Sequence, residues 1–341
     1  MPSIDLHQAA LQGTLSHIAR EDLTLENLCV RNSAGHTPLH LAARHGGLRD
    51  LPPEVLTRET LLLRNDAGYT PLHSAAIGGH LGQLPKAFLE PQFLLARSNS
   101  GYTVYHVAAA HGHLDQIPAA QLTPEAAALV TDLGNTLLHE AAEAGTLDRI
   151  PIGLLTPAAL SARNISGETV FHVAALNGHL DQIPDTLITP EVLRERTNAS
   201  DTVFHAAAIS GHLNQIPHAL LTHKHLVLAS KNGYTAIHAA AETGQLKHIP
   251  HEQFTADLLL TRNDNGDTPL HAAAYEGHLD QIPAKFFTAE LLNARNYGGL
   301  TVGRLAIERG HLDQIPPHLR PRDNALTRLL TRIGLRRAPF A

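Results

Sequence analysis

The sequence predicts an all-α fold, a helical solenoid in which one supersecondary repeat of 33 residues is stacked many times. Three observations support this prediction: threonine and proline each recur every 33 residues without a break, and a glycine follows nine residues after each threonine. A fixed period of this length indicates repeats that contact only their neighbours. The threonines are Thr37, Thr70, Thr103, Thr136, Thr169, Thr202, Thr235, Thr268 and Thr301, and the prolines run from Pro52 to Pro316.

The composition is consistent with such an array and argues against several other classes of protein. Of the 341 residues, 43% are apolar, which is enough for a continuous core, and 17% are charged, which is too few for a disordered chain. The net charge of −6 argues against a protein that coats nucleic acid. Cys29 is the single cysteine, so no intrachain disulfide can form and a reducing compartment is expected.

The N-terminal sequence and the hydropathy bear on where the protein acts. Residues 1–6 have no basic start and no apolar run, so we expect no secretory signal. No stretch reaches the 18 apolar residues that a membrane-spanning helix needs. We therefore expect a cytoplasmic protein, or one delivered to a host cell without a classical signal peptide.

Residues 1–30 are interpreted as a degenerate first repeat. His7 and Gly13 lie one period before His40 and Gly46, but the glycine and threonine that open the later repeats are missing. Terminal repeats are expected to be atypical because one of their faces meets water instead of a neighbour. The sequence therefore predicts an N-terminal capping repeat, and the first complete repeat begins at residue 31.

Each complete repeat opens with a turn, which reads Asn-x-x-Gly-x-Thr in residues 65–70. Glycine allows the positive φ that a tight reversal needs, so Ser200, which replaces it in one repeat, is expected to strain or reshape its turn. The threonine is predicted to cap a first helix by accepting a backbone N–H. Proline at the next position, as in Pro38, suits the first helical residue.

Thr-Pro-Leu-His at 37–40, 70–73 and 268–271, followed by Ala-Ala and then Gly, resembles the ankyrin repeat. The resemblance covers nearly the whole chain. It implies helical repeats with short turn or hairpin fingers, whose turn tips and first helices line a concave surface that grips another protein.

The second half of each repeat departs from that family. Gly-His-Leu-Asp-Gln-Ile-Pro, as at 112–118 and 277–283, replaces the start of an uninterrupted second helix. The proline should stop a helix, and a second threonine cap follows a few residues later, as at Thr123. We expect a single turn, a bend and a short helix of about two turns. The predicted organisation is an N-terminal cap over 1–30, about nine full repeats over 31–316, and a C-terminal capping helix with a basic tail over 317–341.

The 25 histidines invite a metal hypothesis, which their periodicity argues against. Packed helices lie about 10 Å apart, whereas ligands of one zinc ion lie about 3–4 Å apart. We expect the periodic histidines to join the turn and helix start of one repeat to the next through ring hydrogen bonds, and we expect no metal or cofactor. Nine share one position of the repeat: His7, His40, His73, His106, His139, His172, His205, His238 and His271. Six share another: His80, His113, His179, His212, His278 and His311.

Two alternatives remain open from sequence. Five histidines lie off these positions and could bind a transition metal or respond to pH: His218, His223, His225, His248 and His251. From residue 301 onward the chain has eight arginines against three acidic residues, which could steer contact with nucleic acid or a membrane surface.

The sequence has no nucleophile elbow, phosphate-binding loop or zinc-protease motif, so we expect no enzymatic activity. Function should then lie in the positions that differ between repeats. The interpretation is a scaffold that binds another protein, acts as a monomer and does not bind nucleic acid. The candidate contact residues before the threonine are His36, Tyr69, Tyr102, Glu168, Asp201, Tyr234 and Asp267. Those near the end of the first helix are Arg44, His111, Glu143, Glu242 and Tyr275.

Overall fold

The computed structural model describes residues 5–320, and over this range the chain forms α-helices and 3-10 turns without a β-strand. The helical repeat fold predicted from the periodicity is confirmed. Two compact bodies, Met1–Leu187 and Ile188–Ala341, are built from the same repeat and are described separately. The C-terminal helix predicted beyond residue 320 lies outside the described residues.

The first helix of every complete repeat begins directly after its threonine, and in the N-terminal repeat α1 begins after Asp5. In the complete repeats that threonine has extended backbone angles, and the glycine nine residues later takes a positive φ that ends the helix. In the N-terminal body these helices are α1 (Leu6–Gln12), α3 (Pro38–His45), α5 (Pro71–Gly78), α7 (Val104–Ala110), α9 (Leu137–Ala144) and α11 (Val170–Asn177). In the C-terminal body they are α13 (Val203–Ile209), α15 (Ala236–Glu242), α17 (Pro269–Glu276) and α19 (Val302–Arg309).

The second helix is broken, as the proline predicts. Two 3-10 turns flank each bend, as Leu114–Gln116 and Ala119–Gln121 flank Pro118. The short helix after the second threonine has one turn, not about two as predicted. The next finger turn begins only a few residues later, so too few residues remain for a second helical turn. The short helices are α2 (Leu25–Leu28), α4 (Arg58–Leu61), α6 (Pro91–Leu94), α8 (Pro124–Ala127), α10 (Pro157–Leu160), α12 (Pro190–Leu193), α14 (His223–Leu226), α16 (Ala256–Leu260) and α18 (Ala289–Asn293).

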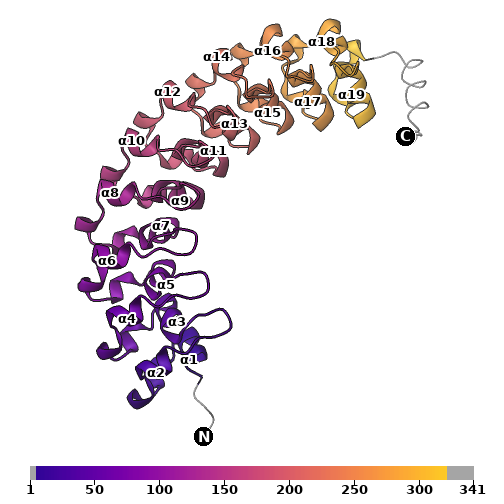
Figure 1. Cartoon of the computed structure of the whole chain (residues 1–341). Coiled ribbons are helices and arrows are strands. Elements are labelled where there is room, and N and C mark those ends of the chain that lie inside the picture. Colours follow the sequence, from indigo (N-terminus) through magenta and orange to yellow (C-terminus); the bar gives the residue numbers. More distant parts are fainter. Residues whose placement is uncertain (1–4, 321–341) are drawn as a thin grey trace. The chain divides into compact units, whose positions relative to one another are not determined.

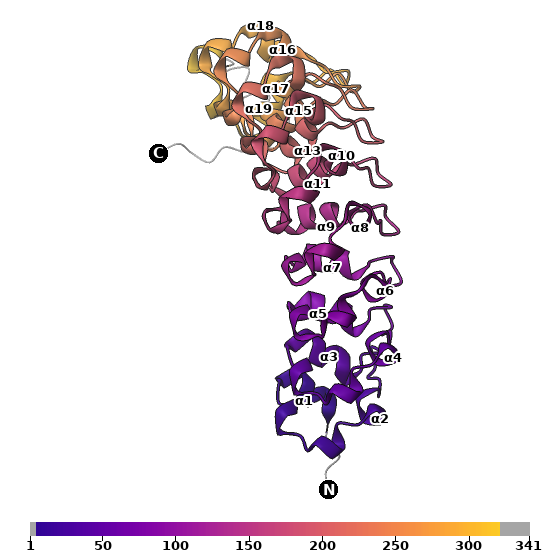
Figure 2. The same ribbon diagram turned by 90° about the vertical axis from the view of Figure 1, so that its left-hand side faces the viewer.

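Within each body the first helices stack in chain order. Figure 1 shows α3, α5, α7 and α9 side by side with the short helices along one edge, and Figure 2 shows the same order from the side. Each short helix packs on the first helix of the following repeat, as α4 does on α5 and α16 on α17. Alanine pairs such as Ala42–Ala43 and Ala75–Ala76 are fully buried. A continuous core therefore runs along the stack in each body, as repeat architectures require.

The turn that carries Ser200 keeps the shape of the other turns. Ser200 has a φ of 68°, which makes it the one described non-glycine residue in the left-handed region. Its neighbours impose that conformation, because the arginine at Arg196 donates to the Ser200 carbonyl at 2.7 Å as its equivalents do to glycine carbonyls. Of the two expected outcomes, strain and reshaping, the structure has strain.

One position of the core is underfilled. The fourth residue of each short helix is a buried leucine in every repeat except one, where it is Ala127. A cavity of about 270 Å³ lies there, lined by Ala127, Ala159 and Leu154 among others. The leucines at this position are Leu28, Leu61, Leu94, Leu160, Leu193, Leu226, Leu259 and Leu292.

Ala127→Leu is expected to raise the free energy of unfolding by about 1 kcal/mol, since it fills apolar space that already exists. Urea denaturation followed by circular dichroism measures the change. Ala120→Leu, at an exposed position of the preceding 3-10 turn, is the matched control and should give no gain. Equal midpoints for the two variants would contradict the interpretation of the cavity as a packing defect.

Candidate functional site

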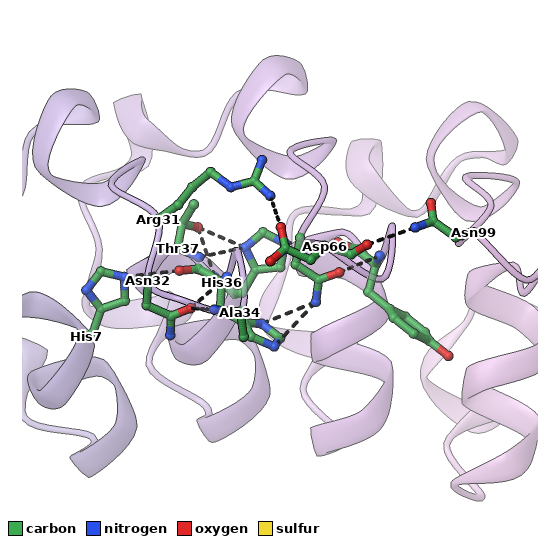
Figure 3. A network of polar contacts seen from close by, with 11 residues as sticks. His7, Arg31, Asn32, Ala34, His36, Thr37, Asp66 and Asn99 are labelled. Carbon is green, nitrogen blue, oxygen red and sulfur yellow. Dashed lines mark hydrogen bonds and ion pairs between the residues drawn. The ribbon is translucent and has the colours of Figure 1, made fainter.

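The turns project as fingers from the first helices and are fixed to one another by main-chain bonds. Asn32 Oδ1 accepts from the N–H groups of Ala34 and His36, each at 3.0 Å, which closes the first turn. The Asp66 N–H donates to the Ala34 carbonyl at 3.3 Å, and the same bond recurs between later turn tips. Figure 3 shows this network around Asn32 and Asp66. The fingers are therefore a preorganised row in each body.

Arginines at the base of the fingers brace the turns. Arg31 pairs with Asp66 of the next turn at 2.6 Å (Figure 3), and Arg163 donates to the Gly167 carbonyl at 2.7 Å. Sequence reasoning missed this role, although the residues recur at the period of the repeat. They are Arg31, Arg64, Arg97, Arg163, Arg196, Arg262 and Arg295.

The nine histidines that share the first periodic position, here called the histidine ladder, join successive repeats, as expected from their spacing. In the complete repeats the Nδ1 atom contacts the threonine cap, and Thr70 N–H donates to His73 Nδ1 at 3.1 Å. This leaves the ring proton on Nε2, which donates to the main-chain carbonyl before the next threonine, at Tyr102 for His73. The same bond to the next repeat is present for His7, His40, His106, His139, His205, His238 and His271, at 3.0–3.2 Å.

Burial favours the neutral form of seven of these nine rings. Burial lowers the pKa of His40, His73 and His106 from 6.5 to about 4. Burial also lowers the pKa of the ladder members His139, His205, His238 and His271. These seven rings therefore contribute hydrogen bonds and no charge to the finger surface at pH 7.

The glutamines of the repeated Asp-Gln pairs belong to the recurring hydrogen bonds that hold the repeats together, as their periodicity indicates. We call this set of recurring hydrogen bonds the frame. Gln182 Nε2 donates to the Gly145 carbonyl at 3.0 Å and its Oε1 accepts from Leu147 N–H at 2.9 Å. Gln314 makes the same pair of bonds to Gly277 and Leu279. These glutamines clamp the end of the preceding first helix, and their amides are satisfied structurally.

The candidate contact residues lie along the fingers and the adjoining helix ends. Those before the threonine are half-buried: His36, Tyr69, Tyr102, Glu168, Asp201, Tyr234 and Asp267. Those near the end of the first helix are exposed: Arg44, His111, Glu143, Glu242 and Tyr275. The side chains of both sets can be reached by a partner, and the recurring hydrogen bonds hold their backbone in place.

In the N-terminal body a buried carboxyl joins two of these tyrosines. Glu140 on α9 is 5% exposed and accepts from Asn135 Nδ2 at 3.0 Å. Burial raises the pKa of Glu140, and burial with the Glu140 charge raises the pKa of Tyr102 to about 12. Burial and the same carboxylate raise the pKa of Tyr69.

Glu140 was not predicted as a site residue. The available signal was its position four residues after the threonine, where the other complete repeats have an apolar or small residue. A carboxyl at a place that is otherwise part of the helix packing surface marks a local departure from the frame.

In the C-terminal body four candidate residues line one cavity of about 320 Å³. Tyr234, Glu242, Asp267 and Tyr275 come from two successive repeats and meet over α15 and α17. The Tyr234 hydroxyl donates to the Glu242 carboxylate, and Asp267 Oδ1 accepts from Asn296 Nδ2 at 2.7 Å. Cavities of this size lie at the lower end of the range for specific ligand sites, about 300–1,000 Å³.

The histidines outside the periodic positions do not form a metal site. His225 is buried, stacks on Phe204 with ring centroids 5.0 Å apart, and contacts the Leu220 carbonyl through Nδ1 at 2.7 Å. His251 lies against Phe254. In residues 5–320 no three His, Cys, Asp or Glu side chains converge to hold a metal ion. Most of the C-terminal arginines lie outside the described residues. No helix in the described part of the chain has the length and apolar character to cross a bilayer.

Comparison with known proteins matches this geometry to a family. A family model of three consecutive ankyrin repeats matches residues 171–251, and a model of a single ankyrin repeat matches residues 265–285. No curated protein matches the chain. Ankyrin repeats are generally protein–protein interaction modules, and proteins built from them are typically non-enzymatic scaffolds. The chain therefore contains ankyrin repeats over these ranges, and the threonine caps, paired alanines and finger turns described above recur in them.

Proposed function

We propose that the protein is a non-enzymatic scaffold that binds a partner protein on the finger turns and the adjoining ends of the first helices. The observation that supports this proposal most is that some positions of each repeat form its recurring hydrogen bonds, whereas another position varies between repeats. Threonine, histidine, glutamine and glycine form the hydrogen bonds that recur in the repeats, and the residue before the threonine supplies the carbonyl that accepts from the ladder histidine. The side chain of that residue differs from repeat to repeat, and in some repeats it also contacts the next turn, as His36 contacts Asn65 and Asp267 contacts Asn296.

Physical preorganisation supports the same surface. The finger tips are joined by main-chain bonds and braced by arginines, so binding would order few groups and lose little conformational entropy. Tyrosines at 69, 102, 234 and 275 add aromatic area with a polar group, which is common at the centres of interfaces. We propose that residues 31–316 act together as this array.

Site-specific photo-crosslinking in cells tests the proposal. A benzophenone amino acid is placed at His111 or at Tyr275, and for comparison at Ile152, which is 72% exposed on the broken second half of its repeat. The expected result is one partner protein captured from His111 and Tyr275 and absent from Ile152. Capture of that partner from Ile152 alone would show that binding uses the opposite part of the repeat.

A further inference from the structure

We propose that the cavity of the C-terminal body formed by α15, α17 and α19 binds an arginine side chain of the partner polypeptide. This inference rests on the proposed function and adds the chemistry of one contact. Its lining has three parts that suit the three parts of an arginine: an apolar wall for the aliphatic stem, carboxylates for the charge, and aromatic rings for the guanidinium plane.

The apolar wall is made by Ala272, Leu300 and Leu305. Leu305 is 7% exposed and belongs to the core, so this side of the cavity is fixed. Long cationic side chains bury their methylene stems along such surfaces while the charged end stays at a polar edge. A short acidic or neutral polar side chain would leave this wall uncovered.

The polar edge is negatively charged. Glu242, Asp267 and Glu276 line the cavity, and its two histidines, His238 and His271, have a pKa lowered by burial and are neutral. The lining residues therefore have a formal charge of −3 at pH 7, which the one positive charge of Arg309 on the Tyr275 ring offsets in part. An anionic ligand would be repelled, and a cation would be attracted.

Each carboxylate retains room for a further donor. Glu242 accepts the Tyr234 hydroxyl and Asp267 accepts Asn296, which occupies one of about four lone-pair positions on each group. Within residues 5–320 no hydrogen bond or ion pair engages the Glu276 carboxylate. Several acceptors around one opening fit the five N–H donors of a guanidinium better than the single point charge of an ammonium.

The rings of Tyr234 and Tyr275 complete the site. Tyr275 already receives a guanidinium within this chain, because the Arg309 Cζ atom lies 3.4 Å from its ring centroid. That contact occupies one face of the Tyr275 ring and shows that this ring accepts a planar cation, a favourable arrangement for arginine. Tyr275 is 45% exposed despite this contact.

The probe is a pentapeptide, Ac-Gly-Gly-Arg-Gly-Gly-amide, added to the full chain and followed by saturation-transfer difference NMR. The expected result is saturation of the arginine side-chain protons with a Kd in the millimolar range, as befits one side chain. A citrulline peptide, which is neutral with nearly the same shape, and a lysine peptide are each expected to bind about tenfold more weakly. Equal binding of citrulline would overturn the role of charge, and equal binding of lysine would overturn the assignment to arginine.

Glu276→Gln tests the location. It removes one charge from the cavity without removing a partner from the fold, and about tenfold weaker binding of the arginine peptide is expected. Glu143→Gln, at an exposed position near the end of α9 in the N-terminal body, is the control and should leave the Kd unchanged. Equal Kd values for the two variants would overturn the site. Since crosslinking from His111 and Tyr275 reports partner capture directly, loss of the arginine site and failure of the scaffold function are separate results.

Discussion

Lowering the pH from about 7.5 to about 4.5 is expected to unfold the repeat array. His40, His73 and His106 have a pKa near 4 in the folded chain against 6.5 when unperturbed. Between these two values the unfolded chain binds more protons than the folded chain, so the free energy of unfolding falls as the pH falls. Above about pH 6.5 these histidines do not change the free energy of unfolding. Near pH 4 the stability that depends on their neutral form is completely lost.

The size of the effect follows from the same numbers. A fall in pKa from 6.5 to about 4 corresponds to about 3 kcal/mol for each of the three histidines. Their sum is comparable to the whole stability of an ordinary domain, about 5–15 kcal/mol. The other ladder histidines act in the same direction, whereas Glu140, whose pKa is raised by burial, opposes the loss weakly.

Urea denaturation at a series of pH values measures this dependence. The midpoint should be constant from pH 8 to 7 and decline steadily below 6.5, and the ring resonances of His40, His73 and His106 should not titrate above pH 5 while the chain is folded. A midpoint that stays constant down to pH 5 would show that these rings do not control stability.

His73→Ala is expected to lower the free energy of unfolding by about 4 kcal/mol. The ring is completely buried, and its removal leaves a cavity between two first helices. It also leaves the Thr70 N–H and the Tyr102 carbonyl without their ring partner. Buried polar groups that lose a partner cost more than the hydrogen bond itself contributed.

The control for this variant is His80→Ala. His80 belongs to the second periodic set, is half-buried and lies at the end of the same repeat's first helix. Its truncation should cost less than about 1 kcal/mol, as is usual for positions near the surface. Chemical denaturation measures the loss in free energy of unfolding for both variants. Similar losses would mean that the capping contact of His73 contributes no more to stability than a position near the surface.

The sequence was sufficient for features that depend on local chemistry and on the period. The threonine caps, the glycine helix ends and the break at Pro118 each follow from residues within one turn of the chain. The ring bonds of the histidine ladder also followed, since a ring that recurs every 33 residues can reach only the neighbouring repeat. The short helix was predicted too long because the space taken by the next turn was not counted.

Features that depend on the lateral offset between repeats could not be derived in this way. The contact of Glu140 with Asn135 requires knowledge of which side of α9 faces the turn. The cavity shared by Tyr234 and Tyr275 requires the distance between successive fingers. The empty space beside Ala127 requires the positions of side chains from two repeats. Pattern analysis identifies these residues as unusual, and only coordinates bring them together.

The acceptor of each ladder histidine is a main-chain carbonyl, and every amino acid supplies one. Repeats joined in this way should be exchangeable as cassettes, since the joint is indifferent to the side chain beside it. Shuffling, deleting or duplicating 33-residue segments would then change the side chains that the fingers present to a partner. The histidine hydrogen bonds between repeats would stay the same. Such a molecule can diversify quickly by recombination, because new specificities arise without new architecture.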